Sequence, residues 1–347
     1  MQPEPTAAAP RHYRAPAWAL FFLVPAVGEL LSGSSPPVEF FNPFTLLLLA
    51  ALYGGGALLI REWTLAWGKG WPTLIVLGVA YAIVEEGLCC KSFFDPHWPD
   101  VGILGTYGHW LGVNWVWAAH LTGYHAVISI LVPITLVELV FPDQRDTRWV
   151  GPRMRWLLAL GLTAVVVLGF LVFPDARQPF RPPPVGYALA VLTVGALVWL
   201  AAHLPAPAPA SGAGAPMRLV WLGVAAFLGT LGWFLVFWVL PHTPVPPAAT
   251  VGLGLSCAGV AAAVIHRLAG VDPAGLAPLQ RWALCAGALL FFILLAPIQE
   301  ATNAQRPDNT TGMTAVGLVF LLGLLWLGRR LRRATPPPAL VAPPPRA

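Results

Sequence analysis

Long runs of apolar residues, separated by short polar connections, make up most of the chain. The lengths of these runs are close to the roughly 20 residues that a helix needs to cross about 30 Å of hydrocarbon. None of them shows the alternation of apolar and polar positions that a membrane β-strand requires. We therefore predict ten helical spans. Their expected ranges are Ala17–Ser32, Phe44–Ile60, Trp71–Cys90, Val113–Val140, Met154–Phe173, Val185–Leu204, Leu219–Leu240, Thr250–Leu268, Trp282–Ile298 and Met313–Leu327.

The composition agrees with this pattern. Of the 347 residues, 57% are apolar and only 10% are charged, whereas a soluble chain carries about 25% charged residues. The formal net charge of +5 falls mainly in the connections and tails, so it indicates topology rather than a partner among nucleic acids. The predicted fold class is all-α, a polytopic transmembrane helical bundle. Its expected partner is the lipid bilayer, and its expected location is the cell membrane.

The distribution of basic residues predicts the orientation of the bundle. If the N-terminus is cytoplasmic, only Lys91, Arg177, Arg181 and Arg306 of the 20 basic residues face outward. Cytoplasmic connections typically carry such an excess of Lys and Arg. An odd number of spans would scramble this asymmetry. We therefore expect both termini to be cytoplasmic.

Changes in composition divide the chain into six parts. Proline-rich stretches with few large apolar residues are typical of disordered or extended segments. The expected parts are a disordered basic tail (1–16), a four-helix part with the polar site (17–141), spans five and six (142–204), a Pro/Ala/Gly linker (205–216), spans seven to ten (217–333) and a disordered Pro-rich tail (334–347).

Ionisable residues inside the predicted spans gather in the N-terminal part. Such residues are costly in lipid and are usually functional. With the orientation above, Glu29, Glu85, Glu86 and His120 fall in one layer near the outer surface, and His125 lies deeper. Adjacent helical residues point about 100° apart. We therefore expect only one of the two neighbouring glutamates to share a site with His120.

The fourth span carries polar residues along two of its faces, which predicts a central position in the bundle, because a helix of this kind should not face lipid. One polar line contains Thr122, His125 and Ser129. The other contains His120, Tyr124, Thr135 and Glu138.

Two connections also carry polar or aromatic features. The segment Lys91–Gly112 is rich in aromatic residues, which fits either an interfacial aromatic belt or a lid over the carboxylate pair. At the end of the second span, Arg61 and Glu62 predict an interfacial ion pair in which the arginine extends towards water.

Three interpretations of the glutamate pair remain open. As a catalytic pair, one carboxylate would activate water while the other orients a metal ion or a hydrogen-bonded partner. A divalent metal such as zinc is the cofactor implied in that case. As a transport site, the pair would bind a proton or a cation, with His120 or His125 in a relay. As a structural feature, one glutamate would pair with Lys91 or cap a neighbouring helix, and the protein would be a non-catalytic scaffold or assembly factor.

The pair also carries a resemblance to a known family. Glu85-Glu86, followed on the next helix by His120, resembles the CAAX-protease and bacteriocin-processing (CPBP) intramembrane proteases, whose motif is Glu-Glu-x-x-x-Arg. Here Cys90 occupies the arginine position. The resemblance implies intramembrane proteolysis. The string VEEGLCCKSFFDP is also similar to uncharacterised bacterial multi-pass proteins.

The sequence thus predicts a site of four residues. Glu85, Glu86, His120 and His125 are the candidate catalytic residues, and Glu29 is a peripheral member of the same site.

Overall fold

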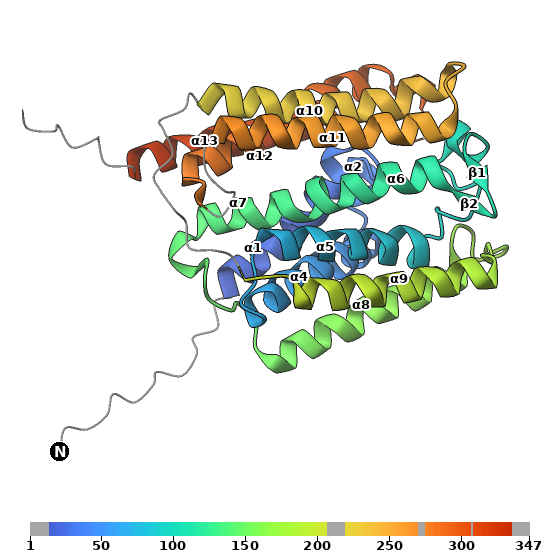
Figure 1. The fold of residues 1–347 in the computed structure, drawn as a ribbon, viewed down its shortest axis with the longest axis horizontal. Coiled ribbons are helices and arrows are strands. Elements are labelled where there is room, and N and C mark those ends of the chain that lie inside the picture. The colour runs from blue at the N-terminus through green and yellow to red at the C-terminus, as the bar shows by residue number, and fades with distance from the viewer. Residues whose placement is uncertain (1–13, 207–218, 270–274, 307, 335–347) are drawn as a thin grey trace, which may run out of the picture.

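The computed structural model describes residues 14–206, 219–269, 275–306 and 308–334. In this part of the chain, long helices lie side by side in a bundle (Figure 1). The predicted tails, 1–16 and 334–347, and the predicted linker, 205–216, fall almost entirely outside the described residues.

Ten helices of the described part are long and apolar enough to span a membrane. They correspond one to one with the predicted runs, so the helical class and the number of spans are confirmed. The segments α1–η1, α3–η2–α4, α5–η3, α6–η5–α7 and α10–η7 each continue without a break as one span. In chain order the segments are α1 (Arg14–Pro25), η1 (Ala26–Leu31), α2 (Pro37–Phe40), α3 (Pro43–Leu49), η2 (Ala50–Gly54), α4 (Gly55–Ala66), α5 (Trp71–Ala82), η3 (Ile83–Cys89), η4 (Gly102–Gly105), α6 (Trp115–Tyr124), η5 (His125–Leu131), α7 (Val132–Val140), η6 (Pro142–Gln144), α8 (Pro152–Val172), α9 (Pro184–His203), α10 (Leu219–Val239), η7 (Leu240–His242), α11 (Pro247–Ala269), α12 (Pro278–Ala301), η9 (Asn303–Gln305) and α13 (Met313–Ala334).

Local sequence signals explain where several spans begin. Prolines stand in the first turn of α3, α5, α8, α9 and α12, where the missing N–H costs nothing. Asn42 precedes α3, and its side chain accepts a hydrogen bond from the Phe44 amide at 3.0 Å. This contact satisfies one of the free amides at the helix start.

The fourth span, α6–η5–α7, is the central element of the bundle. It runs between α5, α8 and α9 on one side and α10 to α13 on the other (Figure 1). In an apolar stretch of 18 residues within this span, 67% is buried, whereas the buried share of the corresponding stretches of α8, α9 and α11 is only 6–11%. The predicted central position is therefore confirmed. The peripheral helices present their apolar side chains to the surroundings of the bundle.

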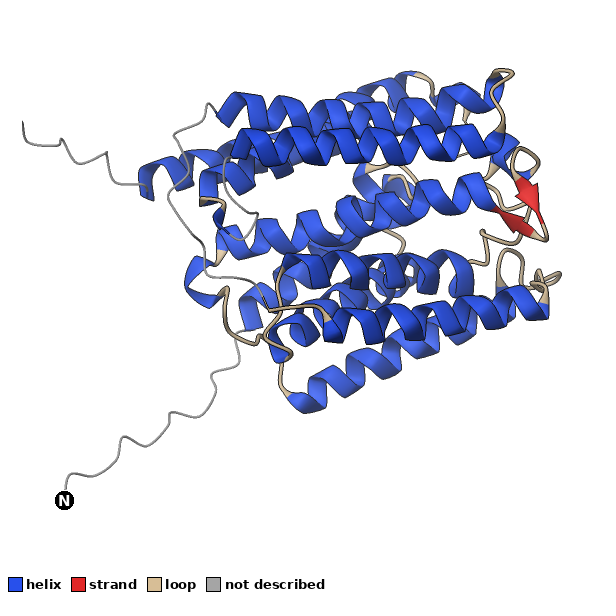
Figure 2. Cartoon of the chain, in the orientation of Figure 1, coloured by secondary structure: helices blue, strands red, loops and turns tan. Residues whose placement is uncertain are grey.

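A small hairpin marks one end of the bundle, which we call the hairpin end. Strands β1 (His109–Trp110) and β2 (Val113–Asn114) pair there in antiparallel fashion (Figure 2). Because Val113 pairs with Trp110, the helix starts at Trp115 rather than at Val113 as predicted. In the loop before the hairpin, Phe93 and Phe94 are buried, whereas Trp110 of the hairpin itself is exposed. The loop therefore packs onto the bundle through part of its aromatic residues.

At the opposite end, Arg61 is buried rather than extended towards water. Its side chain is only 1% exposed, and its guanidinium lies 3.3 Å from the centre of the Trp149 ring. It forms ion pairs with Glu138 at 3.2 Å and Glu62 at 3.5 Å. The predicted ion pair with Glu62 is confirmed. The predicted extension of the arginine towards water is wrong, because the connection between α7 and α8 folds back over α4.

Candidate functional site

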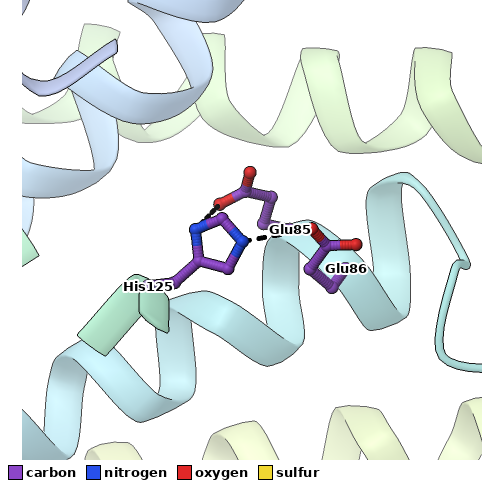
Figure 3. A group of neighbouring side chains, drawn as sticks. All are labelled: Glu85, Glu86 and His125. Atoms are coloured by element: carbon purple, nitrogen blue, oxygen red, sulfur yellow. Dashed lines mark hydrogen bonds and ion pairs between the residues drawn. The ribbon is translucent and has the colours of Figure 1, made fainter. Parts of the chain in front are cut away.

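Glu85 and Glu86, both in η3, converge on His125, the first residue of η5 (Figure 3). Oε2 of Glu85 lies 3.4 Å from Nδ1 of the imidazole, and Oε1 of Glu86 lies 3.1 Å from Nε2. One potential ligand atom from each residue lies within 4.8 Å of the others. All three side chains are buried. The structure thus brings together three of the four predicted site residues.

Both glutamates face the histidine, although the sequence predicted that only one of them would share a site. An imidazole carries nitrogens on two of its edges. The ring lies between the two carboxylates, and each nitrogen faces one of them (Figure 3). One ring can therefore engage two adjacent residues that point in different directions.

His120 is not part of this cluster, which differs from the predicted arrangement. Its ring lies 5.0 Å from that of Phe234 and 4.9 Å from that of Phe237, and its Nδ1 has no hydrogen-bond partner. A separation of five residues turns a side chain about 140° around a helix. His125 therefore faces η3 and His120 faces α10. A catalytic role for His120 stays a prediction.

Hydrogen bonds from neighbouring side chains orient the cluster. The Ser129 Oγ lies 3.1 Å from Nδ1 of His125. Ser92 donates to Oε2 of Glu86, and the Trp117 Nε1 donates to the Ser92 Oγ at 2.9 Å. Ser129 belongs to the polar line visible in the sequence. Ser92 and Trp117 carried no such signal, because they come from a loop and from another face of α6.

Glu29 lies at the edge of the cluster. The Tyr53 hydroxyl donates to its Oε1, and the Ser35 hydroxyl donates to its Oε2 at 3.2 Å. The centre of the Tyr53 ring lies 6.0 Å from that of the His125 ring. Tyr53 thus links Glu29 to the cluster. The sequence carries no signal for Tyr53, because a tyrosine within an apolar run also fits ordinary core packing.

The residues of the cluster share one backbone feature. All four π-helical segments of the described part carry one or more of them: Glu29 lies in η1, Tyr53 in η2, Glu85 and Glu86 in η3, and His125 in η5. π-helical turns are rare and are frequent at functional sites. Their coincidence in four consecutive spans favours a functional role over ordinary packing.

Lys91 does not neutralise either glutamate, in contrast to the structural interpretation of the pair. Its ammonium group donates to the carbonyls of Phe170 at 2.9 Å, Phe173 at 2.8 Å and Phe180 at 3.1 Å. Burial lowers the pKa of Lys91. This lysine therefore fastens the start of the loop to α8 and to the connection that follows it.

The cluster has an excess of acidic groups. With His125 protonated and Glu29, Glu85 and Glu86 ionised, the four side chains would carry a net charge of −2. Buried charge is expensive unless it is paired or coordinates a metal. The site therefore requires bound protons or a bound cation.

The ten apolar helices of the described residues, four of which hold a buried polar cluster, define a multi-pass membrane protein. Residues 19–173 match the model of an uncharacterized membrane protein family. The matched region is less than half of the chain, and it contains every residue of the cluster. This match agrees with the similarity to uncharacterised multi-pass proteins and gives no support for the CPBP family. No curated protein and no solved structure matches the chain.

Proposed function

We propose that this protein is a metal-dependent hydrolase acting within the membrane, with its site at Glu85, Glu86 and His125. The observation that carries the proposal is the convergence of three potential ligand atoms within 4.8 Å. Catalytic zinc sites use three nitrogen or oxygen ligands from the protein and keep one position for water. A divalent cation would also balance the two carboxylates.

The donor set fits such an ion. Oε2 of Glu85 is buried and has no hydrogen-bond partner. Ser129 lies beside Nδ1 of His125, the nitrogen that also faces Glu85, and the other nitrogen is directed at Glu86. Histidines that bind metals are usually oriented through their second nitrogen in this way.

The proposed chemistry is the addition of water to an acyl group. The ion would supply Lewis acidity and make water nucleophilic at neutral pH. A carboxylate of the pair would accept the proton released from water and pass it to the leaving group as the acyl bond breaks, and Ser92 would hold Glu86 in position for this transfer. Here His125 would take the part that the sequence assigned to His120.

The basic residues support a cellular placement for this site. We place the hairpin end outside the cell membrane and both termini in the cytoplasm, because 16 of the 20 basic residues then lie in cytoplasmic connections or tails.

Substituting Glu86 by glutamine is expected to remove the metal and abolish hydrolysis. Glutamine keeps the shape of the side chain but loses the charge that binds a cation. We expect about one divalent ion per chain in the wild-type protein and almost none in Glu86→Gln or His125→Asn. Elemental mass spectrometry of the purified protein measures this content.

His120→Asn is the matched control for this experiment. His120 and His125 are equally buried, at 2% exposure, and lie on the same span, but only His125 contacts the carboxylates. The control should keep the metal. Equal losses in the two histidine variants, or a wild-type protein that binds no zinc when zinc is supplied, would contradict the proposal.

Proton- or cation-coupled transport is a second candidate, and one contact favours it. Both nitrogens of His125 face carboxylates, whereas a neutral imidazole has only one N–H to donate. A protonated ring would satisfy both contacts. The link from Ser35 through Glu29 to Tyr53 continues this set of proton-carrying groups towards the hairpin end.

Under the transport hypothesis, His125→Ala is expected to flatten the pH dependence of uptake. The imidazole is the group that lies between the two carboxylates, so the wild-type rate should depend on pH and the rate of the variant should not. Uptake of labelled small molecules into reconstituted vesicles, with an imposed pH gradient, measures the rate. Identical pH profiles for the wild type and the variant would argue against transport.

A further inference from the structure

A large groove runs along the central span, on the side between α5 and α9 and the pair α10 and α11. Its volume is about 1680 Å³, which exceeds the roughly 300–1,000 Å³ of pockets for drug-sized ligands. Most of its lining is apolar and includes Leu74, Val127 and Leu131. Val127 is 40% exposed, so the groove is open at the level of η5. The middle of the groove fits hydrocarbon chains.

The end of the groove opposite the hairpin is basic. Glu138 is shared by three guanidinium groups, those of Arg61 at 3.2 Å, Arg281 at 3.8 Å and Arg145 at 3.9 Å. Among the described residues, the basic side chains that line the groove are Arg61, Lys69, Arg145 and Arg281, and the acidic ones are Glu138 and Asp146. With Glu62, the buried partner of Arg61, four cations stand against three carboxylates, which leaves an excess of one positive charge at this end.

We propose that the groove binds a phospholipid with an anionic head group. The phosphate would lie at Arg145 and Arg281, and the acyl chains would lie along η5 and α6. Basic pockets between transmembrane helices bind anionic head groups at the cytoplasmic side. The positive-inside distribution assigns this end to the cytoplasm. The apolar length of the groove selects a lipid over a soluble phosphate.

This lipid site is separate from the Glu/His cluster. Glu138 follows His125 by thirteen residues, which corresponds to about 20 Å along a helix. A head group held at the arginines would therefore lie far from the carboxylate pair, and only the chains would reach that level. The proposal does not depend on whether the cluster catalyses hydrolysis.

The test compares two phospholipids with identical acyl chains, phosphatidylglycerol and phosphatidylcholine. Native mass spectrometry of the delipidated full chain measures how much of each lipid is retained. We expect the wild type to prefer phosphatidylglycerol, and we expect Arg281→Gln and Arg145→Gln each to reduce that preference about fivefold. Arg61 stays in place to pair with Glu138, so both variants should fold.

Two further variants test whether the preference depends on the arginines of the groove and on its apolar part. Arg330→Gln changes an exposed arginine on α13 at the same end of the bundle, and it should leave the preference unchanged. Val127→Trp fills the apolar part of the groove without changing its charge, and it should release phosphatidylglycerol. Equal retention of the two lipids, or an equal loss in Arg330→Gln, would overturn the proposal. Displacement of the lipid by glycerol phosphate or by a co-purifying protein would overturn it as well.

Discussion

Replacing Arg61 by methionine is expected to lower the free energy of unfolding by about 3–5 kcal/mol, the usual cost of removing one partner of a buried ion pair. Besides its contacts with Trp149, Glu62 and Glu138, this arginine donates to the backbone carbonyls of Arg145 and Thr147. Methionine fills similar space but leaves the acceptors without a donor. Titration with SDS in mixed micelles, followed by tryptophan fluorescence, measures the loss.

Arg148→Met is the control for this prediction. Arg148 belongs to the same connection but is exposed, and exposed arginines contribute little to stability. The double variant Arg61→Met/Glu138→Gln should lose less than the sum of its single variants, because the second change removes a charge that the first leaves uncompensated. An Arg61→Met protein as stable as the wild type would show that the ion pairs do not hold this end together.

Replacing Gly287 by alanine is expected to destabilise the bundle by about 1–3 kcal/mol, the usual cost of inserting atoms into a packed interior. A Cβ at this position would lie well under 3.0 Å from the backbone oxygen of Gly223. The helices α10 and α12 therefore meet backbone to backbone, which only small residues allow. Relief of this contact requires the two helices to move apart.

Gly259→Ala is the matched control, and it should raise the free energy of unfolding rather than lower it. Gly259 lies within α11, and a Cβ added there would meet no atom of the described residues within 4 Å apart from its own helix and chain neighbours. Alanine there should stabilise the helix by roughly 0.5–1 kcal/mol. The same SDS titration measures both variants. Equal effects at the two positions would contradict the close approach of α10 and α12.

The ten spans were predictable because a helix that crosses the hydrocarbon layer needs a run of about 20 apolar residues. Runs such as Trp71–Cys90 and Met154–Phe173 have nearly the observed limits. The start of the fourth span was placed too early, because Val113 is apolar enough to continue a helix. Its pairing with Trp110 across a turn is a tertiary contact that a count of apolar residues does not reveal.

The sequence identified the two glutamates, but it did not identify which histidine they meet, because they contact His125, which was predicted to lie deeper than His120. The orientation of the spans placed the glutamates and His120 in one layer, and this ranked His120 above His125. The packing of α6 against α10 and of η5 against α5 decides which imidazole meets the carboxylates. A single sequence contains that information only as the polar line through His125 and Ser129.

The π-helical segment η5 lies where the fourth span changes its packing partners. The fourth span changes neighbours along its length: α6 packs against α10 and α11, η5 against α5, and α7 against α1 and α12. His125 stands at the first of these changes. The span therefore contacts a different set of helices in each of its three segments. His125 is thus held against the glutamates by the packing of η5 on α5, while α6 and α7 are held by other helices.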